Sequence, residues 1–344
     1  MQGVRLDGGG SVDGQGYWWW WDTIVTTRDD RPMIIHCEGG RDVSIANVTL
    51  IDAPYYHVLL RDMVGVHIEH TSVIVHVEKQ QELLTRAGHW DHVGGVPTFP
   101  LNTDGFDVAG RDVVIENVYV QNFDDAVAIK PANGHFKNAQ CSSNILIRNA
   151  EVSYSVGLSI GSVPPADGHN CVNGVVFDSV IMTNAIKAMY VKTNPGTDGT
   201  GEITNVTYSN IQVKNAFWYP IWVGPQQQDQ PGNNSNTGCS FFYPKVPRCP
   251  TQPLVPVKDI HFNNVTVSGA LLMPGVVLCP STVHCQGISM DNVHITGEYR
   301  LQDDWSCANA DLTTNNVSPM PVCNNSATGL PRVRPPPVAF IPTK

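Results

Sequence analysis

Three aspartates in this 344-residue chain have the side chains and the spacing that acid-base chemistry needs. Asp104 lies in the segment Asn102-Thr103-Asp104-Gly105, and the pair Asp124-Asp125 follows further along the chain. Glycoside hydrolysis uses such a set, because one protonated carboxyl donates to the leaving oxygen while an ionised carboxylate activates water or attacks carbon. Crowding helps as well, since like charges a few Å apart do not all ionise easily, and one pKa therefore rises.

The same residues also have an ordinary structural interpretation. Asp-Gly and Asn-Thr-Asp sequences usually mark turns, and either segment alone would be assigned to a turn. A repeat around them favours the chemical interpretation. An alternating apolar strand, a turn residue (usually Asn or Asp) and a second apolar strand recur at residues 43–50, 113–120, 145–152, 175–182, 206–213, 260–267 and 288–295.

From Asn117 to Asn210 the turn position returns roughly every thirty residues, without helical periodicity in between, and this indicates a solenoid of stacked coils. Equivalent residues of successive coils then lie about 4.8 Å apart, and the turn asparagines are expected to bond one another as a ladder. A β-sandwich is the alternative, but it has no reason to keep this period. We predict an all-β fold, a single-stranded right-handed parallel β-helix. Asp104 and Asp124-Asp125, about one coil apart, should then lie side by side.

The coils that follow add candidate substrate-binding residues. Residues 155–163 lie one coil beyond the aspartates, and Tyr190-Val191-Lys192-Thr193 lies a further coil on. If the coils stack, Lys192 projects into the groove of the aspartates, where a cation would suit an anionic sugar; an ordinary surface lysine is the alternative. Trp218 and Trp222 follow on the next coil and could stack on sugar rings or pack in the core.

Composition narrows the fold and the partners. Hydrophobic residues make up 42% and charged residues 15% of the chain, with 30 Gly and 25 Pro, which is typical of many short strands joined by turns. The net charge of -10 makes nucleic acid and anionic membranes poor partners. No apolar run approaches the length of a membrane span. We expect a monomer that meets an anionic polymer through a local basic patch.

The nine cysteines are scattered and none forms a CxxC pair, so a zinc site is not favoured. Some bracket loops and predict local disulfides in an oxidising compartment; these pairs are Cys239/Cys249, Cys279/Cys285 and Cys307/Cys323. The odd number leaves one free thiol, or one cysteine that has lost its partner. Together with six Asn-x-Ser/Thr sequons this predicts a secreted glycoprotein. No signal peptide precedes the first coil, so we expect that the N-terminal part is missing.

Two further segments contain residues of chemical interest. His89-Trp90-Asp91-His92 has metal-ligand residue types, but its Gly- and Pro-rich surroundings indicate a loop, and we expect no metal site and no cofactor. The run Trp18 to Trp21 is expected to alternate as a strand, burying two rings and exposing two, so that it caps the first coil or lines the groove. The tail from about residue 298 to 344 is expected to be irregular.

The motifs together resemble glycoside hydrolase family 28, the polygalacturonase and rhamnogalacturonase family. The resemblance covers roughly residues 3–297 and includes the Gly- and Asp-rich segment 4–16, the three aspartates and Gly157-Leu158-Ser159-Ile160-Gly161-Ser162. It implies a right-handed parallel β-helix and hydrolysis with inversion. By this resemblance Asp124 is the general acid, and Asp104 and Asp125 hold and deprotonate the attacking water. Asn102 then helps to fix that pair and the substrate, and Lys192 binds a substrate carboxylate.

Two positions depart from the polygalacturonase pattern. Ser155-Val156-Gly157 stands where polygalacturonases carry Gly-His-Gly, and Tyr190-Val191-Lys192 where they carry Arg-Ile-Lys. Losing a histidine and a guanidinium should weaken galacturonate recognition. Rhamnogalacturonan-cleaving members of the family also lack that histidine and have a tyrosine near a retained lysine, so the departures indicate an altered substrate.

Several hypotheses follow for one β-helix domain over residues 1–344. The first is a hydrolase of galacturonate-containing pectic polysaccharide, with rhamnogalacturonan-type activity as a close alternative. A long stretch from about residue 77 to 97 could wall off one end of the groove and would make the enzyme exo-acting. The second is a catalytically silent β-helix that binds cell-wall glycan. The third, a pectate lyase, would need calcium and form an unsaturated product.

Overall fold

The computed structural model describes residues 2–26, 29–88, 100, 102–166, 168–227 and 249–324. The described residues form twenty strands and two helices, α1 (Tyr17–Thr26) and α2 (Val77–Arg86). The strands are β1 (Gln2–Leu6), β2 (Ser11–Asp13), β3 (Ile35–Ala46), β4 (Thr49–Ile51), β5 (Val58–Glu69), β6 (Ser72–Ile74), β7 (Phe106–Gln121), β8 (Asp125–Ile129), β9 (Ala132–Asn133), β10 (Ser142–Ser153), β11 (Gly157–Val163), β12 (His169–Ala185), β13 (Met189–Thr193), β14 (Thr200–Ala216), β15 (Ile221–Gln226), β16 (Val257–Ala270), β17 (Val276–Leu278), β18 (Cys285–Gly297), β19 (Ser306–Ala308) and β20 (Ala310–Ser318).

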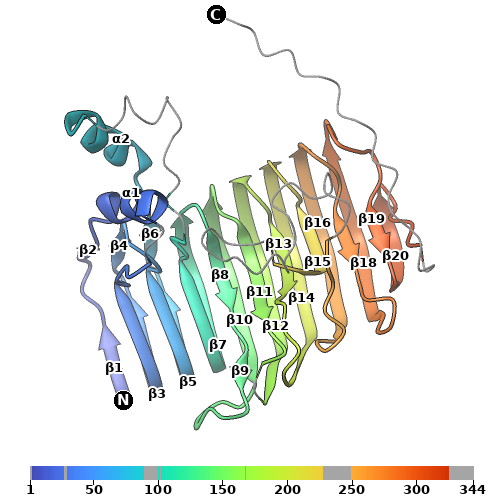
Figure 1. Ribbon diagram of the computed structural model, residues 1–344, viewed down its shortest axis with the longest axis horizontal. Coiled ribbons are helices and arrows are strands. Elements are labelled where there is room, and N and C mark those ends of the chain that lie inside the picture. The colour runs from blue at the N-terminus through green and yellow to red at the C-terminus, as the bar shows by residue number, and fades with distance from the viewer. Residues whose placement is uncertain are drawn as a thin grey trace, which may run out of the picture.

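Apart from the two-residue β9, which pairs antiparallel with β12, these strands stack in parallel as the coils of a β-helix, as Figure 1 shows. Ten long strands follow one another from β1 and β3 through β5, β7, β10, β12, β14, β16 and β18 to β20, each paired in parallel with the next. A second row of shorter strands runs beside them, from β8 through β11, β13, β15 and β17 to β19. The predicted parallel β-helix is confirmed.

From β3 onward the interior of the coils is filled by inward-facing strand residues, mostly Val and Ile, whereas the residues of β1 and β2 are exposed. Register places Phe177, Tyr208 and Phe262 at equivalent positions of β12, β14 and β16. Their rings stack with centroids 4.8 and 5.3 Å apart and nearly parallel planes. Because successive strands are closely spaced, equivalent aromatic side chains stack on one another. This stacking fixes the register of the strands, and the register decides which side chains face outward.

Asparagines form the predicted ladder where the long strands bend. Asn117, Asn149, Asn210, Asn264 and Asn292 all have φ between 52° and 56°, a left-handed conformation that asparagine tolerates well. Side-chain amides connect Asn149 to Asn117, Asn264 to Asn210 and Asn292 to Asn264, over 2.8 to 3.3 Å. The repeat in the sequence is therefore a repeat of this bend.

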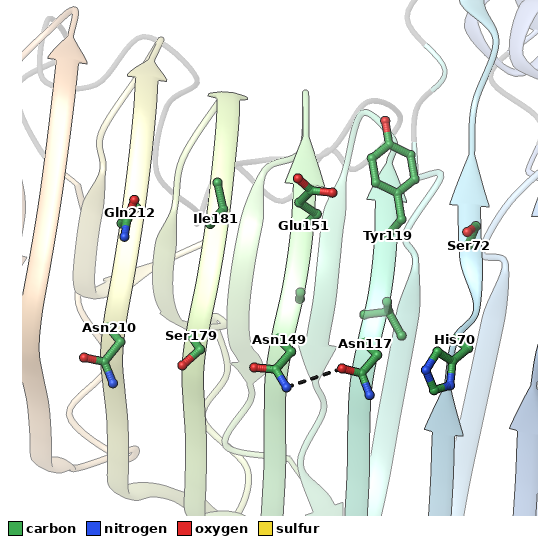
Figure 2. A pocket seen from close by; sticks show the side chains of 12 residues that line it. His70, Ser72, Asn117, Tyr119, Asn149, Glu151, Ser179, Ile181, Asn210 and Gln212 are labelled. Atoms are coloured by element: carbon green, nitrogen blue, oxygen red, sulfur yellow. Dashed lines mark hydrogen bonds between the residues drawn. The ribbon is translucent and has the colours of Figure 1, made fainter.

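A shallow groove of about 720 Å³ follows the bend across several coils (Figure 2). Two rows of side chains line it, one from His70 through Asn149 to Asn210 and one from Ser72 through Glu151 to Gln212. The residues that line this groove do not include the three aspartates.

The run of tryptophans is helical, and the strand predicted for it is wrong. Trp18 to Trp21 belong to α1, where Tyr17 and Trp20 lie three residues apart and pack edge to face at 5.5 Å. Trp20 is buried and its Nε1–H donates to the carbonyl of Ala53, at 3.0 Å. Trp18 and Trp19 are exposed, because the helical period turns their side chains away from the coil.

The tail expected to be irregular from about residue 298 contains two more strands. β19 and β20 pair in parallel with β17 and β18 and extend the solenoid to Ser318. The sequence did not reveal them because β19 has only three residues and those of β20 are mostly exposed or half-buried, which leaves a weak apolar pattern. Within the described part of the chain, no helix is long and apolar enough to cross a membrane.

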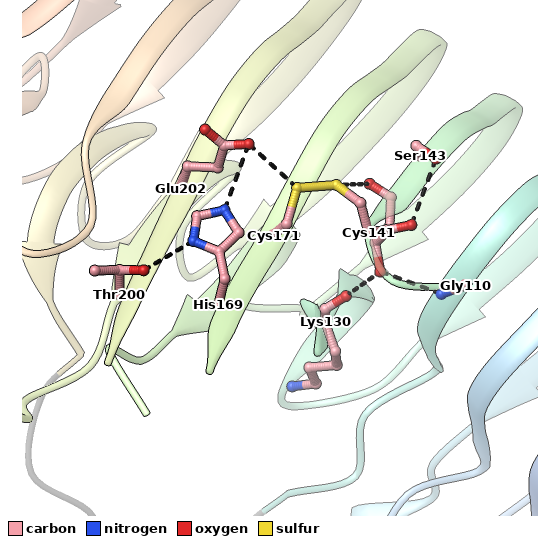
Figure 3. The surroundings of a disulfide bond; sticks show 9 residues. Gly110, Lys130, Cys141, Ser143, His169, Cys171, Thr200 and Glu202 are labelled. Atoms are coloured by element: carbon pink, nitrogen blue, oxygen red, sulfur yellow. Dashed lines mark hydrogen bonds and ion pairs between the residues drawn. A yellow bond between two sulfur atoms is a disulfide. The ribbon is translucent and has the colours of Figure 1, made fainter. Parts of the chain in front are cut away.

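Disulfides connect neighbouring coils and close local loops. The predicted pairs Cys279–Cys285 and Cys307–Cys323 are confirmed, and Cys239, the predicted partner of Cys249, lies outside the described residues. Figure 3 shows a third disulfide, Cys141–Cys171, which joins two cysteines 30 residues apart. That separation is about one coil, so the repeat itself could have predicted this bond. Among the described cysteines Cys37 is free.

Candidate active site

The three predicted aspartates converge. One carboxylate oxygen each from Asp104, Asp124 and Asp125 lies within 4.8 Å of the others. Asp104 and Asp125 are buried and Asp124 is half-buried. They come from two successive coils: Asp104 lies just before β7, and the pair lies at the start of β8.

A close contact between backbones holds these two coils together. The N–H of Gly105 donates to the carbonyl of Asp125 at 2.9 Å. A Cβ at Gly105 would lie 2.4 Å from the carbonyl oxygen of Ala126, a distance that real Cβ atoms do not show. The glycine after Asp104 is therefore needed for the approach of the coils, and with it for the approach of the carboxylates.

Backbone groups orient the carboxyl of Asp124. Its Oδ1 accepts the N–H of Asp125 at 2.9 Å, and its Oδ2 accepts the N–H of Asn102 at 3.1 Å. Its own carbonyl accepts the N–H of Val156 at 2.8 Å and the hydroxyl of Ser155 at 2.7 Å, from the next coil. The predicted Asn102 thus contacts Asp124 through its backbone.

Asp125 faces the following coils, which supply its polar partners. Lys192 Nζ lies 2.7 Å from Asp125 Oδ2, and both side chains are buried. Ser159 donates its hydroxyl to the other carboxylate oxygen. Lys192 was expected to project towards the aspartates, and its ammonium lies against Asp125, so its partner there is a carboxylate of the protein.

The sequence reasoning missed a second ion pair, between Lys130 and Asp107. Lys130 Nζ lies 3.1 Å from Asp107 Oδ2 and 3.9 Å from Asp104 Oδ2. Register pairs Asp107 with Ala128, two residues before Lys130, so strand alternation turns the side chains of Asp107 and Lys130 to the same face. That alternation was readable in the sequence once the coil boundaries were known.

The four carboxyl groups have different affinities for protons. Burial raises the pKa of Asp104 well above its usual range, and the nearby carboxylates of Asp107 and Asp124 add to the effect. Burial and the charge of Asp125 likewise raise the pKa of Asp124, while burial raises that of Asp107 to about 6. For Asp125, burial is more than offset by Lys192 and Lys130, so its pKa is lowered. The surroundings therefore favour the ionised form of Asp125 and the protonated forms of its neighbours.

Comparison with known proteins places the chain in a family. The model of the family described as glycosyl hydrolases family 28 matches residues 1–318. The chain belongs to this family.

Relatives and solved structures of family 28 agree with the fold. A probable exopolygalacturonase X of Aspergillus terreus is 27% identical over 233 residues, which cover 63% of this chain and 48% of the relative. Its counterpart in Neosartorya fischeri is 25% identical over 334 residues, covering 92% and 68%. The chain thus spans about half the length of the first relative. The structure of a polygalacturonase from Erwinia carotovora matches with a TM-score of 0.64 at 22% identity, covering 91% of this chain and 71% of that one, which supports the parallel β-helix fold.

The two departures from the polygalacturonase pattern lie together beside the carboxylates. Tyr190 is buried and packs edge to face on Trp222, with 5.9 Å between ring centroids. Val156 and Trp218 are partly buried against this aromatic cluster. The substrate-binding role of Tyr190, Trp218 and Trp222 stays a prediction. Their burial favours packing around the site over direct contact with a sugar.

Besides Lys192, a second lysine, Lys187, lies against this aromatic cluster. It was not identified from the sequence. It is buried, with Nζ 3.6 Å from the ring centroid of Tyr190 and 4.6 Å from that of Trp222. Burial, assisted by the charge of Lys192, lowers the pKa of Lys187 well below its usual value. No periodic signal marks it, because it lies in the turn before β13.

A metal at the three aspartates is not favoured by their surroundings. Three carboxylate oxygens within 4.8 Å could hold a cation by type. However, the ammonium of Lys192 already pairs with Asp125, and that of Lys130 lies 3.9 Å from Asp104. These positive charges oppose a divalent ion. The candidate His89-Trp90-Asp91-His92 lies outside the described residues.

Proposed function

We propose that the protein hydrolyses galacturonate-containing pectic polysaccharide with inversion, in the manner of a polygalacturonase. The observation that carries the proposal is the convergence of three aspartates in unlike environments. A glycosidase needs one carboxyl that holds its proton and another that stays ionised, and the opposite pKa shifts of Asp124 and Asp125 support this division of roles.

In this proposal Asp124 donates its proton to the leaving oxygen. Its raised pKa keeps that proton available, and two backbone N–H bonds fix its direction. Asp125, held ionised by Lys192, accepts the proton of the attacking water. Asp104 binds the same water and, when protonated, orients it.

The compactness of the cluster bears on where the water binds. Acid and base of inverting enzymes usually lie about 6.5–9.5 Å apart, whereas oxygens of these three carboxyls lie within 4.8 Å of one another. Because this spacing leaves little room for a water between acid and base, we propose that the water lies to one side of Asp124. There it is held by Asp104 and Asp125 and faces the sugar. Proton NMR of the first product formed tests this: inversion gives the anomer opposite to that of the substrate, and retention would contradict it.

The substrate is proposed from the cations at the site. Lys130 and Lys192 concentrate positive charge at the carboxylates of a chain whose net charge is -10, which suits a uronate group. A rhamnogalacturonan-type substrate is the second candidate. It is favoured by Tyr190, which is buried where polygalacturonases carry an arginine.

We also propose that the protein is secreted and acts as a monomer. Three described disulfides support an oxidising compartment. Much of the stretch from about residue 77 to 97, which could wall off one end of the groove, lies outside the described residues, so exo-acting cleavage stays a prediction. An exo-acting enzyme should release small products from the chain ends from the start, whereas an endo-acting enzyme should first produce fragments of intermediate length.

The deciding experiment measures reducing-sugar release from polygalacturonate and from rhamnogalacturonan, with Asp124→Asn as the inactive control. Release from the first substrate alone supports the polygalacturonase, and release from the second alone supports the runner-up. Retained binding without release from either would show a silent glycan-binding protein. Chelator-sensitive activity with an unsaturated, ultraviolet-absorbing product would instead show a lyase.

A further inference from the structure

Arg31 is a buried arginine in the connection between α1 and β3, outside the coils that carry the aspartates. Its Nε and Nη2 donate to the two carboxylate oxygens of Asp29 at 2.8 and 3.1 Å, and its Nη1 donates to the carbonyl of Pro54 at 3.4 Å. Its guanidinium also lies over the ring of Tyr55, 4.5 Å from the centroid. These contacts fix the plane of the guanidinium before any contact with the site is considered.

One further bond connects this guanidinium with the active site. Arg31 Nη2 donates to Asn102 Oδ1 at 3.0 Å. Asn102 has φ of 58°, a conformation that few side chains adopt, and its backbone N–H donates to Asp124 Oδ2 at 3.1 Å. Asn102 therefore lies between the arginine and the proposed acid, with one hydrogen bond to each.

We propose that Arg31 is a positioning residue for Asp124, acting through Asn102. The proposal rests on the function proposed above, in which Asp124 is the acid. The guanidinium holds the amide of Asn102, and this holds the backbone N–H of Asn102 on the carboxyl of Asp124. The hydrogen bonds described for the guanidinium go to Asp29, Pro54 and Asn102, so we assign it a positioning role exerted through Asn102.

The chemistry of the two bonds explains what Arg31 adds. A backbone N–H that donates to a carboxylate stabilises its ionised form and lowers its pKa. It also leaves one direction open for the proton that the acid donates. Without Arg31, the N–H of Asn102 is no longer fixed on Asp124. The pKa of Asp124 then rises and its carboxyl rotates away from the leaving oxygen, and a misplacement of about 1 Å costs up to roughly 100-fold in rate.

The test compares Arg31→Met, which keeps most of the aliphatic stem, with Arg31→Lys and with the surface variant Arg148→Lys. Arg148 pairs with Glu116 on the outside of the coil and serves as the matched control. For Arg31→Met we expect kcat to fall roughly 10- to 100-fold, with KM nearly unchanged. The alkaline limb of the kcat profile should move to higher pH, because an acid with a raised pKa keeps its proton longer. Arg31→Lys should retain part of the activity and Arg148→Lys all of it.

Asn102→Gly completes a double-mutant cycle, since glycine tolerates the conformation of Asn102 and lacks only the amide. Arg31→Met should have no further effect on kcat in this background, and additive losses would overturn the proposal. Carbon-13 NMR titration of the aspartate carboxyls, with Asp124→Asn to assign the signal, measures the pKa of Asp124 without any substrate. An unchanged pKa in folded Arg31→Met, or in Asn102→Gly if Arg31→Met does not fold, would also overturn it. If the wild-type protein is inactive but the pKa of Asp124 still differs between wild type and Arg31→Met, the proposed function is refuted and the positioning role of Arg31 is not.

Discussion

Replacing Lys192 with methionine tests the division between acid and base most directly. Lys192 Nζ lies 2.7 Å from Asp125 Oδ2, and the two side chains are 5% and 1% exposed. At this distance two unit charges attract by about 6 kcal/mol with an effective dielectric constant of 20, and desolvation of both ions cancels part of this. Removing one partner of a buried pair typically costs about 3–5 kcal/mol, because the other charge stays buried and uncompensated.

The pKa of Asp125 registers this loss. If about 3 kcal/mol of the attraction favours the ionised form, the pKa of Asp125 rises by about two units in Lys192→Met. A base must be ionised to act, so activity appears only as the pH rises through its pKa. The acidic limb of kcat should therefore move about two units to higher pH, and the urea midpoint of unfolding should fall.

The assay is kcat at saturating substrate over pH, with unfolding in urea followed by circular dichroism on the same samples. Lys192→Arg keeps the charge and should keep the acidic limb near its original position. Adding Asp125→Asn to Lys192→Met should recover stability, because no buried charge is then left unpaired, but not activity. A folded Lys192→Met with an unmoved acidic limb would refute Asp125 as the base that Lys192 holds ionised.

Three further predictions concern stability and the approach of the coils. Because burial raises the pKa of Asp107 to about 6, the folded state favours the neutral form of this carboxyl. Its contribution to stability is therefore complete below pH 3.8 and is lost as the pH rises through about 6. Tm should fall between pH 4 and 7, and a rise in Tm would contradict the burial of neutral carboxyls. Gly105→Ala should abolish most activity and lower Tm, while Gly134→Ala, whose new Cβ would meet its nearest atom at 3.8 Å, should do neither. Replacing Cys141 and Cys171 by serine should cost about 3–4 kcal/mol of unfolding free energy, from the entropy of a loop of this length; a loss under about 1 kcal/mol would show that coil stacking alone holds them.

The sequence predicted the site because the fold is periodic. Asp104 and Asp124 lie about one coil apart, and in a solenoid this alone makes two residues neighbours. The same rule placed Lys192 near them. Phe177, Tyr208 and Phe262 show why the rule holds: their stacking fixes the register of successive coils without reference to the site.

The residues that were missed are those whose position depends on details within a coil. Asp107 was overlooked because its strand begins immediately after a turn motif, where alternation is hard to count. Lys187 lies in a turn and is recognisable only by the aromatic rings around it. The helix α1 was missed because four consecutive tryptophans fit a strand and a helix equally well, and packing of Trp20 against the first coils decided between them.

Asp124 and Asp125 are adjacent and chemically identical, yet their pKa values shift in opposite directions. The cause is where the strand begins. Asp125 is the first residue of β8, and its side chain contacts Ser159 and Lys192 on later coils. Asp124 still belongs to the turn, and the hydrogen bonds described for its carboxyl oxygens come from two backbone N–H groups. One boundary between turn and strand thus gives Asp125 a direct contact with Lys192, whose charge acts on Asp124 only from further away. A change in the coil of Lys192 should therefore alter the base more than the acid.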